Sequence, residues 1–231
     1  MEHRQFASLE GPFASAPARG ADEAVLILLH GWGADGRDLI DLAGPLQAQL
    51  PYLHLFTPHA PAPCTANPMG RQWFELTESF FEKPASALAE INEVSLVIEE
   101  MIEAVSASLS IARRKIILGG FSQGGMMTLH LASQSAADKA KQLGGYASIA
   151  GALMAPDNVK PAGDADTPAP IWLAHGQLDQ VVPFMALEKA QQKFTNEGYD
   201  VSICVRDLMG HSIDMPTLES LTQFIKNTAL S

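Results

Sequence analysis

Short apolar runs recur along the 231-residue chain, separated by segments in which apolar side chains return every three or four positions. Each apolar run predicts a strand buried on both faces, because such a strand offers no polar side to solvent. Alternating apolar and polar residues at 199–205 predict a half-buried strand instead. Residues 1–24, rich in Ala, Pro, Gly and Ser, predict a short edge strand and a loop. The buried strands are expected at 25–29, 53–57, 115–118, 144–151 and 171–175.

Helical spacing is clearest over residues 86–109, where apolar side chains form one stripe and glutamates form the opposite face. Strands that alternate with helices throughout, without a repeat or a linker, predict one doubly wound α/β domain over residues 1–231. Further helices are expected at 39–46, at 126–132, at 184–194 before Gly198, and from Pro216 onward.

Fifteen basic residues against 26 acidic ones give the chain a formal charge of −11. This charge repels phosphate backbones and anionic membrane surfaces, so we expect no nucleic-acid partner. The longest aliphatic run, 25–29, is too short to cross a bilayer, and no stable membrane insertion is expected. Cys64 and Cys204 lie far apart without metal-ligand spacing. They indicate free thiols in a reducing compartment, and we expect a cytoplasmic protein without a metal or cofactor.

The turn at residues 119–125, Gly-Gly-Phe-Ser-Gln-Gly-Gly, joins the run 115–118 to the helix expected at 126–132. Between a strand and a helix, a Gly-x-Ser-x-Gly pattern is typical of a nucleophile elbow, a strained turn that lifts the Ser122 hydroxyl above the sheet. Glycine at Gly120 and Gly124 avoids collisions as the turn closes. The alternative is a plain glycine-rich connection with a solvated serine.

A second glycine-flanked turn, His-Gly-Trp-Gly at residues 30–33, follows the first apolar run. In folds with a nucleophile elbow, the turn after an early strand supplies a main-chain N–H to an oxyanion. Trp32 is the expected donor, and a plain strand-to-helix turn is the alternative.

The segment 58–79 is dense in proline and also carries Trp73 and Phe74. Long ordered loops in compact domains often bind ligands. These two aromatic residues are expected either to contact a ligand or to anchor the loop in the core.

Ser122, Asp179 and His211 each follow a predicted strand, and reactive residues of doubly wound sheets gather at the carboxyl ends of strands. A serine hydroxyl needs a base to become a nucleophile, a role open to His211. Asp179 would hold the imidazole in the correct tautomer. The main-chain N–H groups of Gln123 and Trp32 would receive the oxyanion.

Other residues compete for these roles. Asp207 is a rival acid four residues before His211, but its position at the end of the histidine's own strand limits its reach. The remaining histidines do not follow the last strand. His30 and His175 each end a strand before a glycine, and we interpret them as structural.

These segments together resemble the phospholipase/carboxylesterase family of serine hydrolases, which includes acyl-protein thioesterases and small bacterial carboxylesterases. The resemblance implies a three-layer α/β-hydrolase fold with a mostly parallel central sheet and helices on both faces. It also implies the triad Ser122, Asp179 and His211 and the oxyanion donors Trp32 and Gln123. The segments that carry it are Leu-His-Gly-Trp-Gly at 29–33, Pro-His-Ala-Pro at 58–61, Arg-Gln-Trp-Phe at 71–74, Gly-Phe-Ser-Gln-Gly-Gly at 120–125, His-Gly at 175–176 with Asp179, Val182 and Pro183, and Gly-His at 210–211.

The sequence departs from the family pattern at two positions. Better-known thioesterases carry Trp-Phe-Asp or Trp-Tyr-Asp where this chain has Glu75 after Trp73 and Phe74, and they often have leucine in place of Trp32. The oxyanion contact uses the main chain, so catalysis should survive both differences. We expect the two differences to change the shape of the acyl pocket instead.

The functional hypothesis is a metal-independent hydrolase of carboxylic esters or thioesters that forms an acyl-enzyme. Its substrate would be a small ester or acylated molecule, with short to medium acyl chains in a groove near Trp73, Phe74 and Leu76. Lysophospholipase or protein S-deacylase activity is the alternative within enzymes, and a catalytically idle binding protein is the alternative outside them. Ser122 excludes a dienelactone hydrolase, which would need cysteine there, and a dehalogenase, which would need aspartate. A homodimer formed through apolar residues around the groove stays open.

Overall fold

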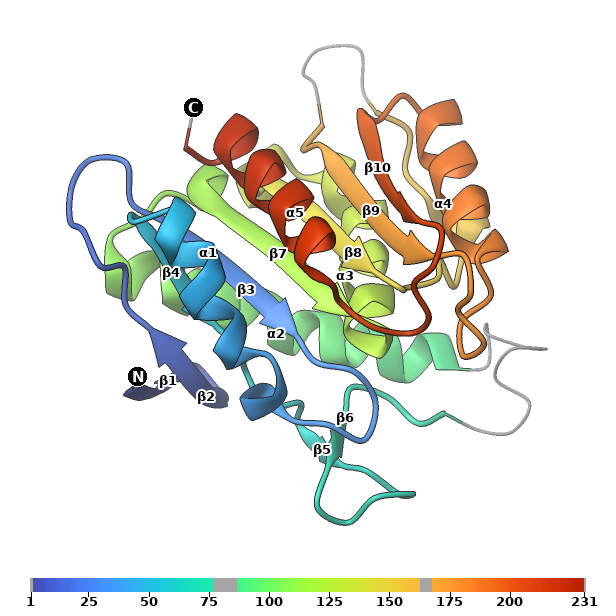
Figure 1. The fold of residues 1–231 in the computed structure, drawn as a ribbon, viewed down its shortest axis with the longest axis horizontal. Coiled ribbons are helices and arrows are strands. Elements are labelled where there is room, and N and C mark those ends of the chain that lie inside the picture. Colours follow the sequence, from blue (N-terminus) through green and yellow to red (C-terminus); the bar gives the residue numbers. More distant parts are fainter. Residues whose placement is uncertain (1, 77–86, 163–167, 231) are drawn as a thin grey trace.

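The computed structural model describes residues 2–76, 87–162 and 168–230 (Figure 1). Its centre is an eight-stranded sheet in the order β1-β2-β4-β3-β7-β8-β9-β10. From β4 to β10 all neighbours pair in parallel, whereas β2 is antiparallel to both β1 and β4. The strands are β1 (Glu2–Phe6), β2 (Leu9–Ala14), β3 (Ala24–Leu29), β4 (Leu53–Phe56), β7 (Ile116–Phe121), β8 (Gly145–Ile149), β9 (Ile171–Gly176) and β10 (Val201–Arg206).

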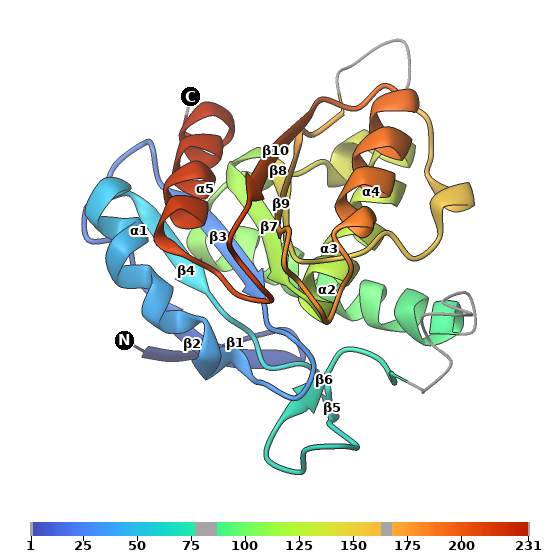
Figure 2. The same ribbon diagram turned by 45° about the vertical axis from the view of Figure 1, so that its right-hand side comes forward.

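Helices cover both faces of the sheet, as Figures 1 and 2 show. On β3, Val25, Ile27 and Leu29 belong to the core shared with α2, α3 and α4, while the alternate residues face α1 and α5. The predicted three-layer α/β architecture with a mostly parallel sheet is confirmed. The helices are α1 (Ala43–Gln49), α2 (Leu88–Leu109), α3 (Gln123–Gln134), α4 (Met185–Asn196) and α5 (Met215–Thr228).

The expected buried strands and the half-buried strand β10 are present, and α2 matches the expected helix, whose first residue, Ser86, lies outside the described residues. The expectation of a single edge strand near the N-terminus was wrong, because β1 and β2 form a hairpin. Phe6, Leu9 and Phe13 are buried and attach this hairpin to the core. The helix expected at 39–46 begins only at Ala43, after two 3-10 turns.

Within the segment 58–79, two very short strands, β5 (Ala62–Pro63) and β6 (Arg71–Gln72), pair as a hairpin beside the main sheet. The predicted long loop is therefore partly structured over its described residues, and its last part, from residue 77, lies outside them.

The turn between β7 and α3 is closed by main-chain packing. A Cβ added to Gly124 would overlap the carbonyl oxygen of Leu29, at the end of β3, and one added to Gly120 would overlap the main chain of Gly124. Only glycine lets the helix start this close to two strands. The carboxyl ends of β3 and β7 therefore lie side by side beneath the start of α3.

We expect Gly124→Ala to lower the free energy of unfolding by about 3 kcal/mol, because overpacking a fixed core typically costs about 1–3 kcal/mol. Gly44→Ala in α1 is the matched control, since a Cβ there meets nothing within 4 Å. It should leave stability unchanged or raise it by up to about 1 kcal/mol, as alanine is the better helix former. Urea unfolding measures both, and equal stabilities would contradict the packing argument.

Candidate active site

Ser122 sits in a strained turn at the carboxyl end of β7. Its φ of 54° and ψ of −115° lie outside the regions that non-glycine residues normally occupy. Two main-chain hydrogen bonds hold this conformation: Ser122 N donates to Ile149 O at 2.8 Å, and Met126 N donates to Ser122 O at 2.9 Å. The predicted elbow is thus present in the backbone.

The structure brings the three predicted catalytic side chains together. His211 Nε2 lies 2.9 Å from Ser122 Oγ, and His211 Nδ1 lies 2.7 Å from Asp179 Oδ2. A carboxylate only accepts hydrogen bonds, so Nδ1 carries the ring proton and Nε2 is left to accept from the serine hydroxyl. This is the tautomer required of a general base.

Asp179 is held in place by the turn after β9. Its Oδ1 accepts from Val181 N at 2.8 Å and from Val182 N at 2.9 Å, while Oδ2 faces His211. The residue is buried, so water does not compete for these bonds. Asp207, the rival acid, is exposed, and Asp179 already occupies the Nδ1 side of the imidazole.

His30 and His175 serve the main chain around the site. His30 donates from Nδ1 to Gly31 O at 2.8 Å and accepts from Ala60 N at Nε2, and burial lowers its pKa to about 4. His175 Nε2 donates to Val182 O at 2.8 Å and lies 3.3 Å from Asp179 Oδ2; burial lowers its pKa as well. Both residues therefore have the structural role that the sequence indicates, and His175 also supports the turn that holds Asp179.

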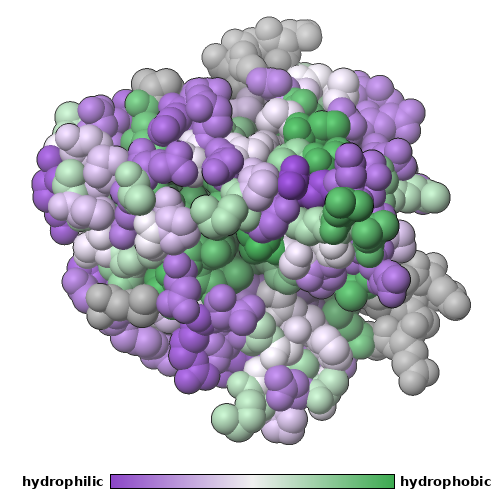
Figure 3. Space-filling model, viewed as in Figure 1, coloured by the Kyte–Doolittle hydropathy of each residue, from purple (hydrophilic) through white to green (hydrophobic). Residues whose placement is uncertain are grey.

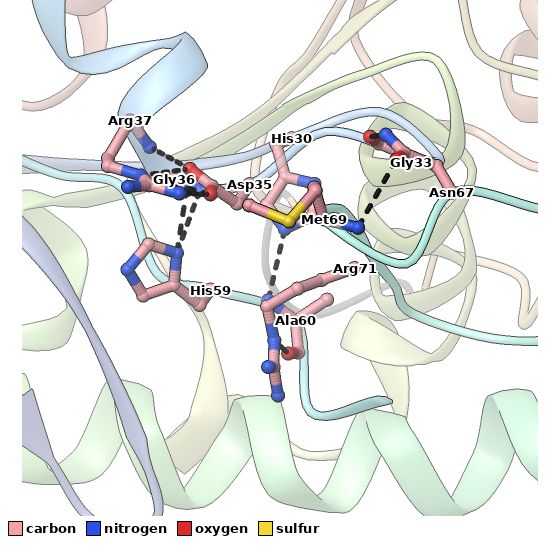
Figure 4. A network of polar contacts seen from close by, with 10 residues as sticks. All are labelled: His30, Gly33, Asp35, Gly36, Arg37, His59, Ala60, Asn67, Met69 and Arg71. Carbon is pink, nitrogen blue, oxygen red and sulfur yellow. Dashed lines mark hydrogen bonds and ion pairs between the residues drawn. The ribbon is translucent and has the colours of Figure 1, made fainter. Parts of the chain in front are cut away.

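Side chains of the loop 59–71 fasten the turn after β3 (Figure 4). Asn67 Nδ2 donates to Gly33 O at 2.7 Å, and His59 Nδ1 accepts from Gly36 N at 3.1 Å. Arg71 Nε donates to the carbonyl oxygen of Ala60, the residue whose N–H donates to His30. The turn that carries Trp32 is therefore supported from both ends.

Gln123 is the first residue of α3, so its main-chain N–H lies in the first turn, where the helix provides no carbonyl partner. Its side chain is fully buried. The amide oxygen accepts from Trp73 N at 2.9 Å, and the amide nitrogen donates to Phe74 O at 2.7 Å. The segment 71–74 is thereby attached to the elbow.

Trp73 and Phe74 anchor their loop in the core, which is one of the two roles expected for them. Both side chains have an exposed fraction of 0%. The Trp73 indole donates to His30 O at 2.9 Å. Because their rings are enclosed, these residues do not line an open groove, whereas Leu76 is only partly buried.

Sequence reasoning missed Gln72, a 3%-exposed residue whose amide oxygen accepts from Trp32 Nε1 at 3.0 Å. A glutamine between an arginine and a tryptophan carries no pattern that predicts a buried amide. The available signal was its place in the Arg-Gln-Trp-Phe segment.

A family model described as phospholipase/carboxylesterase matches residues 13–229. The chain belongs to the phospholipase/carboxylesterase family. Among relatives of this protein, acyl-protein thioesterase 1 of Eremothecium gossypii is 31% identical over 225 residues, covering 92% of this chain and 93% of that protein. Acyl-protein thioesterase 1 of Saccharomyces cerevisiae is 28% identical over 220 residues, covering 89% and 93%.

Solved structures agree with this assignment. The crystal structure of esterase PE8 matches this protein with a TM-score of 0.82 and 31% sequence identity, covering 95% of this chain and 99% of the PE8 chain. The carboxylesterase of Bacillus cereus, at 16% identity and a TM-score of 0.73, covers 96% and 95% and supports the fold alone. The predicted α/β-hydrolase fold and family are confirmed, and the protein is a serine hydrolase of the carboxylesterase and thioesterase family.

The helices and the two cysteines of this protein bear on the expectations about membrane insertion and thiols. Among the helices of the described residues, none combines the length and the apolar character needed to cross a membrane. Cys64 and Cys204 are free thiols.

Stability should depend on pH through His30. Its folded pKa of about 4 lies below the ordinary 6.5, so between these values the unfolded chain binds a proton that the folded chain does not. Stability present above pH 6.5 is therefore lost as the pH falls towards 4, by about 3 kcal/mol from this residue. Urea unfolding at several pH values should show a shallower dependence for His30→Gln than for the wild type. The exposed residue His3 provides the control, His3→Gln, and equal pH dependence in all three proteins would contradict the prediction.

Proposed function

We propose that the protein hydrolyses carboxylic esters or thioesters through an acyl-enzyme on Ser122. The observation that carries the proposal is the continuous chain from Ser122 Oγ to His211 and on to Asp179, with distances of 2.9 and 2.7 Å. Both are hydrogen-bonding distances, and the carboxylate at the end of the chain is fixed by two N–H groups.

In the first half of the reaction, Ser122 Oγ attacks the acyl carbonyl carbon while His211 Nε2 takes the hydroxyl proton. Asp179 stabilises the imidazolium that forms. The carbonyl electron pair moves onto oxygen and returns as the bond to the leaving alcohol or thiol breaks, and His211 gives that group its proton. In the second half, water repeats the attack on the acyl-enzyme and releases the acid.

The oxyanion of the tetrahedral intermediate would be received by the main-chain N–H groups of Gln123 and Trp32. Gln123 opens α3, where unpaired N–H groups and the helix dipole favour negative charge. Trp32 belongs to the turn beside the elbow, since a Cβ on Gly31 would lie 3.4 Å from Ser122 Cβ. Removal of one such donor typically costs about 10²- to 10³-fold in rate.

The acyl group is proposed to lie over apolar surface beside the triad. Leu178, Val181 and Leu208 are exposed in the loops that carry Asp179 and His211. Figure 3 shows apolar surface in the middle of this face and at its right, near the carboxyl ends of β9 and β10. Trp73 and Phe74 are fully buried and leave no open groove at this part of the loop, so short to medium chains are proposed to be favoured over long ones.

Deacylation of proteins or lysolipids is the second candidate function. It is favoured by the similarity to acyl-protein thioesterase 1 of Eremothecium gossypii, at 31% identity over 92% of this chain. The exposed apolar loops could contact an acylated peptide as well as a small ester, and they could equally form the contact of a homodimer.

A cytoplasmic location is proposed on the basis of the two free thiols.

Ser122→Ala should abolish hydrolysis of p-nitrophenyl esters, a loss of at least about 10⁴-fold, because the attacking oxygen is gone. It should also abolish covalent labelling by a fluorophosphonate. Wild-type activity measured from acetate to palmitate should peak at short to medium chains. Labelling that persists in Ser122→Ala would refute the assignment, and wild-type protein that is neither labelled nor active would indicate an idle site.

Asp179→Asn should lower kcat by about 10⁴-fold, since the amide favours the wrong imidazole tautomer. Asp207→Asn is the control for removal of a nearby acid, and its kcat should match the wild type. Circular dichroism checks that both variants fold. Equal losses in the two variants would reject Asp179 as the orienting acid.

A further inference from the structure

The two positions at which the sequence departs from the family pattern, Trp32 and Glu75, are joined through Gln72. Trp32 Nε1 donates to Gln72 Oε1 at 3.0 Å, and Gln72 Nε2 donates to Glu75 Oε2 at 2.6 Å. Glu75 Oε1 also accepts from Thr65 Oγ1 at 2.8 Å. A continuous hydrogen-bonded chain therefore runs from the indole of the proposed oxyanion residue to an acidic residue on the neighbouring loop.

The orientation of the Gln72 amide follows from its partners. The Trp32 indole and Thr65 N, 3.3 Å from Gln72 Oε1, can only donate, so the amide oxygen must face them. The amide nitrogen is then directed at Glu75, where a carboxylate is the acceptor. A buried amide with every neighbour matched has one favourable orientation, and the indole is fixed with it.

The main chain around Trp32 is held independently of the hydrogen bonds between the Trp32, Gln72 and Glu75 side chains. Gly33 N donates to Arg71 O at 3.0 Å, and Arg71 N donates to Ala34 O at 2.8 Å. Loss of the indole bond would therefore free the Trp32 side chain while its N–H stays in place. The side chain is 37% exposed, so it has open space to move into.

We propose that Gln72, held by Glu75, is a positioning residue that keeps the Trp32 indole as a wall of the acyl site and thereby sets the accepted chain length. This inference rests on the proposed function. Trp32 follows Gly31, and a Cβ on Gly31 would lie 3.4 Å from Ser122 Cβ, so the residue that carries the indole lies beside the nucleophile. Release of the indole should admit longer acyl chains and leave the chemistry on the shortest ones almost unchanged.

The kinetic test compares p-nitrophenyl acetate with p-nitrophenyl decanoate. Gln72→Met keeps the length of the side chain without its hydrogen bonds, and Trp32→Phe keeps a ring without the N–H. Each should raise the decanoate-to-acetate ratio of kcat/KM by about 3- to 10-fold, the range that one hydrogen bond typically spans. In Gln72→Met the change should lie in KM for decanoate, with kcat for acetate close to the wild type. Gln192→Met, on the exposed face of α4, is the matched control.

The double variant Trp32→Phe/Gln72→Met decides whether the two residues act as one unit. If Gln72 acts through the indole, the double variant should have the ratio of either single variant. Multiplied effects would show that the residues act separately and would overturn the proposal.

Tryptophan fluorescence tests the positioning without any turnover. Trp32 is 37% exposed, whereas Trp73 is 0% and Trp172 is 2% exposed, so acrylamide quenching reports mainly on Trp32. In the Ser122→Ala background, Gln72→Met should shift the emission to the red and increase quenching. Glu75→Gln should act in the same direction, and Gln192→Met should have no effect.

The outcomes separate the two claims. Unchanged quenching overturns the positioning role, whatever the activity. Altered quenching with an unchanged chain-length ratio overturns the specificity role. Wild-type protein without any esterase activity overturns the proposed function, and with it the specificity role, while the quenching result still decides whether Gln72 fixes the indole.

Discussion

The close approach of the main chain at Gly124 to the end of β3 is the constraint on which the site depends. With no side chain between them, the start of α3 rests directly on Leu29 and on the end of β7. This contact places the turn after β3 beside Ser122 and directs the first N–H groups of the helix to the same space. A strained serine backbone is tolerated because close main-chain packing at Gly120 and Gly124 fixes the turn on both sides of Ser122.

A second layer of order comes from the segment 71–74, which contacts both proposed oxyanion donors. The Gln123 side chain binds the main chain of Trp73 and Phe74, the Trp73 indole binds His30 O, and Gln72 binds the Trp32 indole. Residues that are distant in sequence thus form one polar framework beneath the site. Donors to an oxyanion are effective when they need no reorganisation during the reaction, and such a framework provides that rigidity.

Much of this could be predicted from the sequence, because the signals were local. Apolar runs gave the central strands, and the glycine pattern at 119–125 gave the elbow. The residues that meet at Ser122 followed from the rule that parallel strands end at one edge. The N-terminal hairpin was missed because Phe6, Leu9 and Phe13 are spread among small residues and reveal their role only against the core. The Trp32–Gln72–Glu75 chain was missed because hydrogen bonds between loops distant in sequence leave no periodic trace.

The double use of Gln123 affects how substitutions at this position should be interpreted. The atom proposed to do the chemistry is a main-chain nitrogen, which every amino acid other than proline supplies with its hydrogen. The side chain, buried and bonded through both ends of its amide, ties the helix start to a separate loop. A survey of variants would therefore find position 123 intolerant of change although no catalytic side chain is lost there. Intolerance near this site measures the rigidity of the scaffold as much as participation in the reaction.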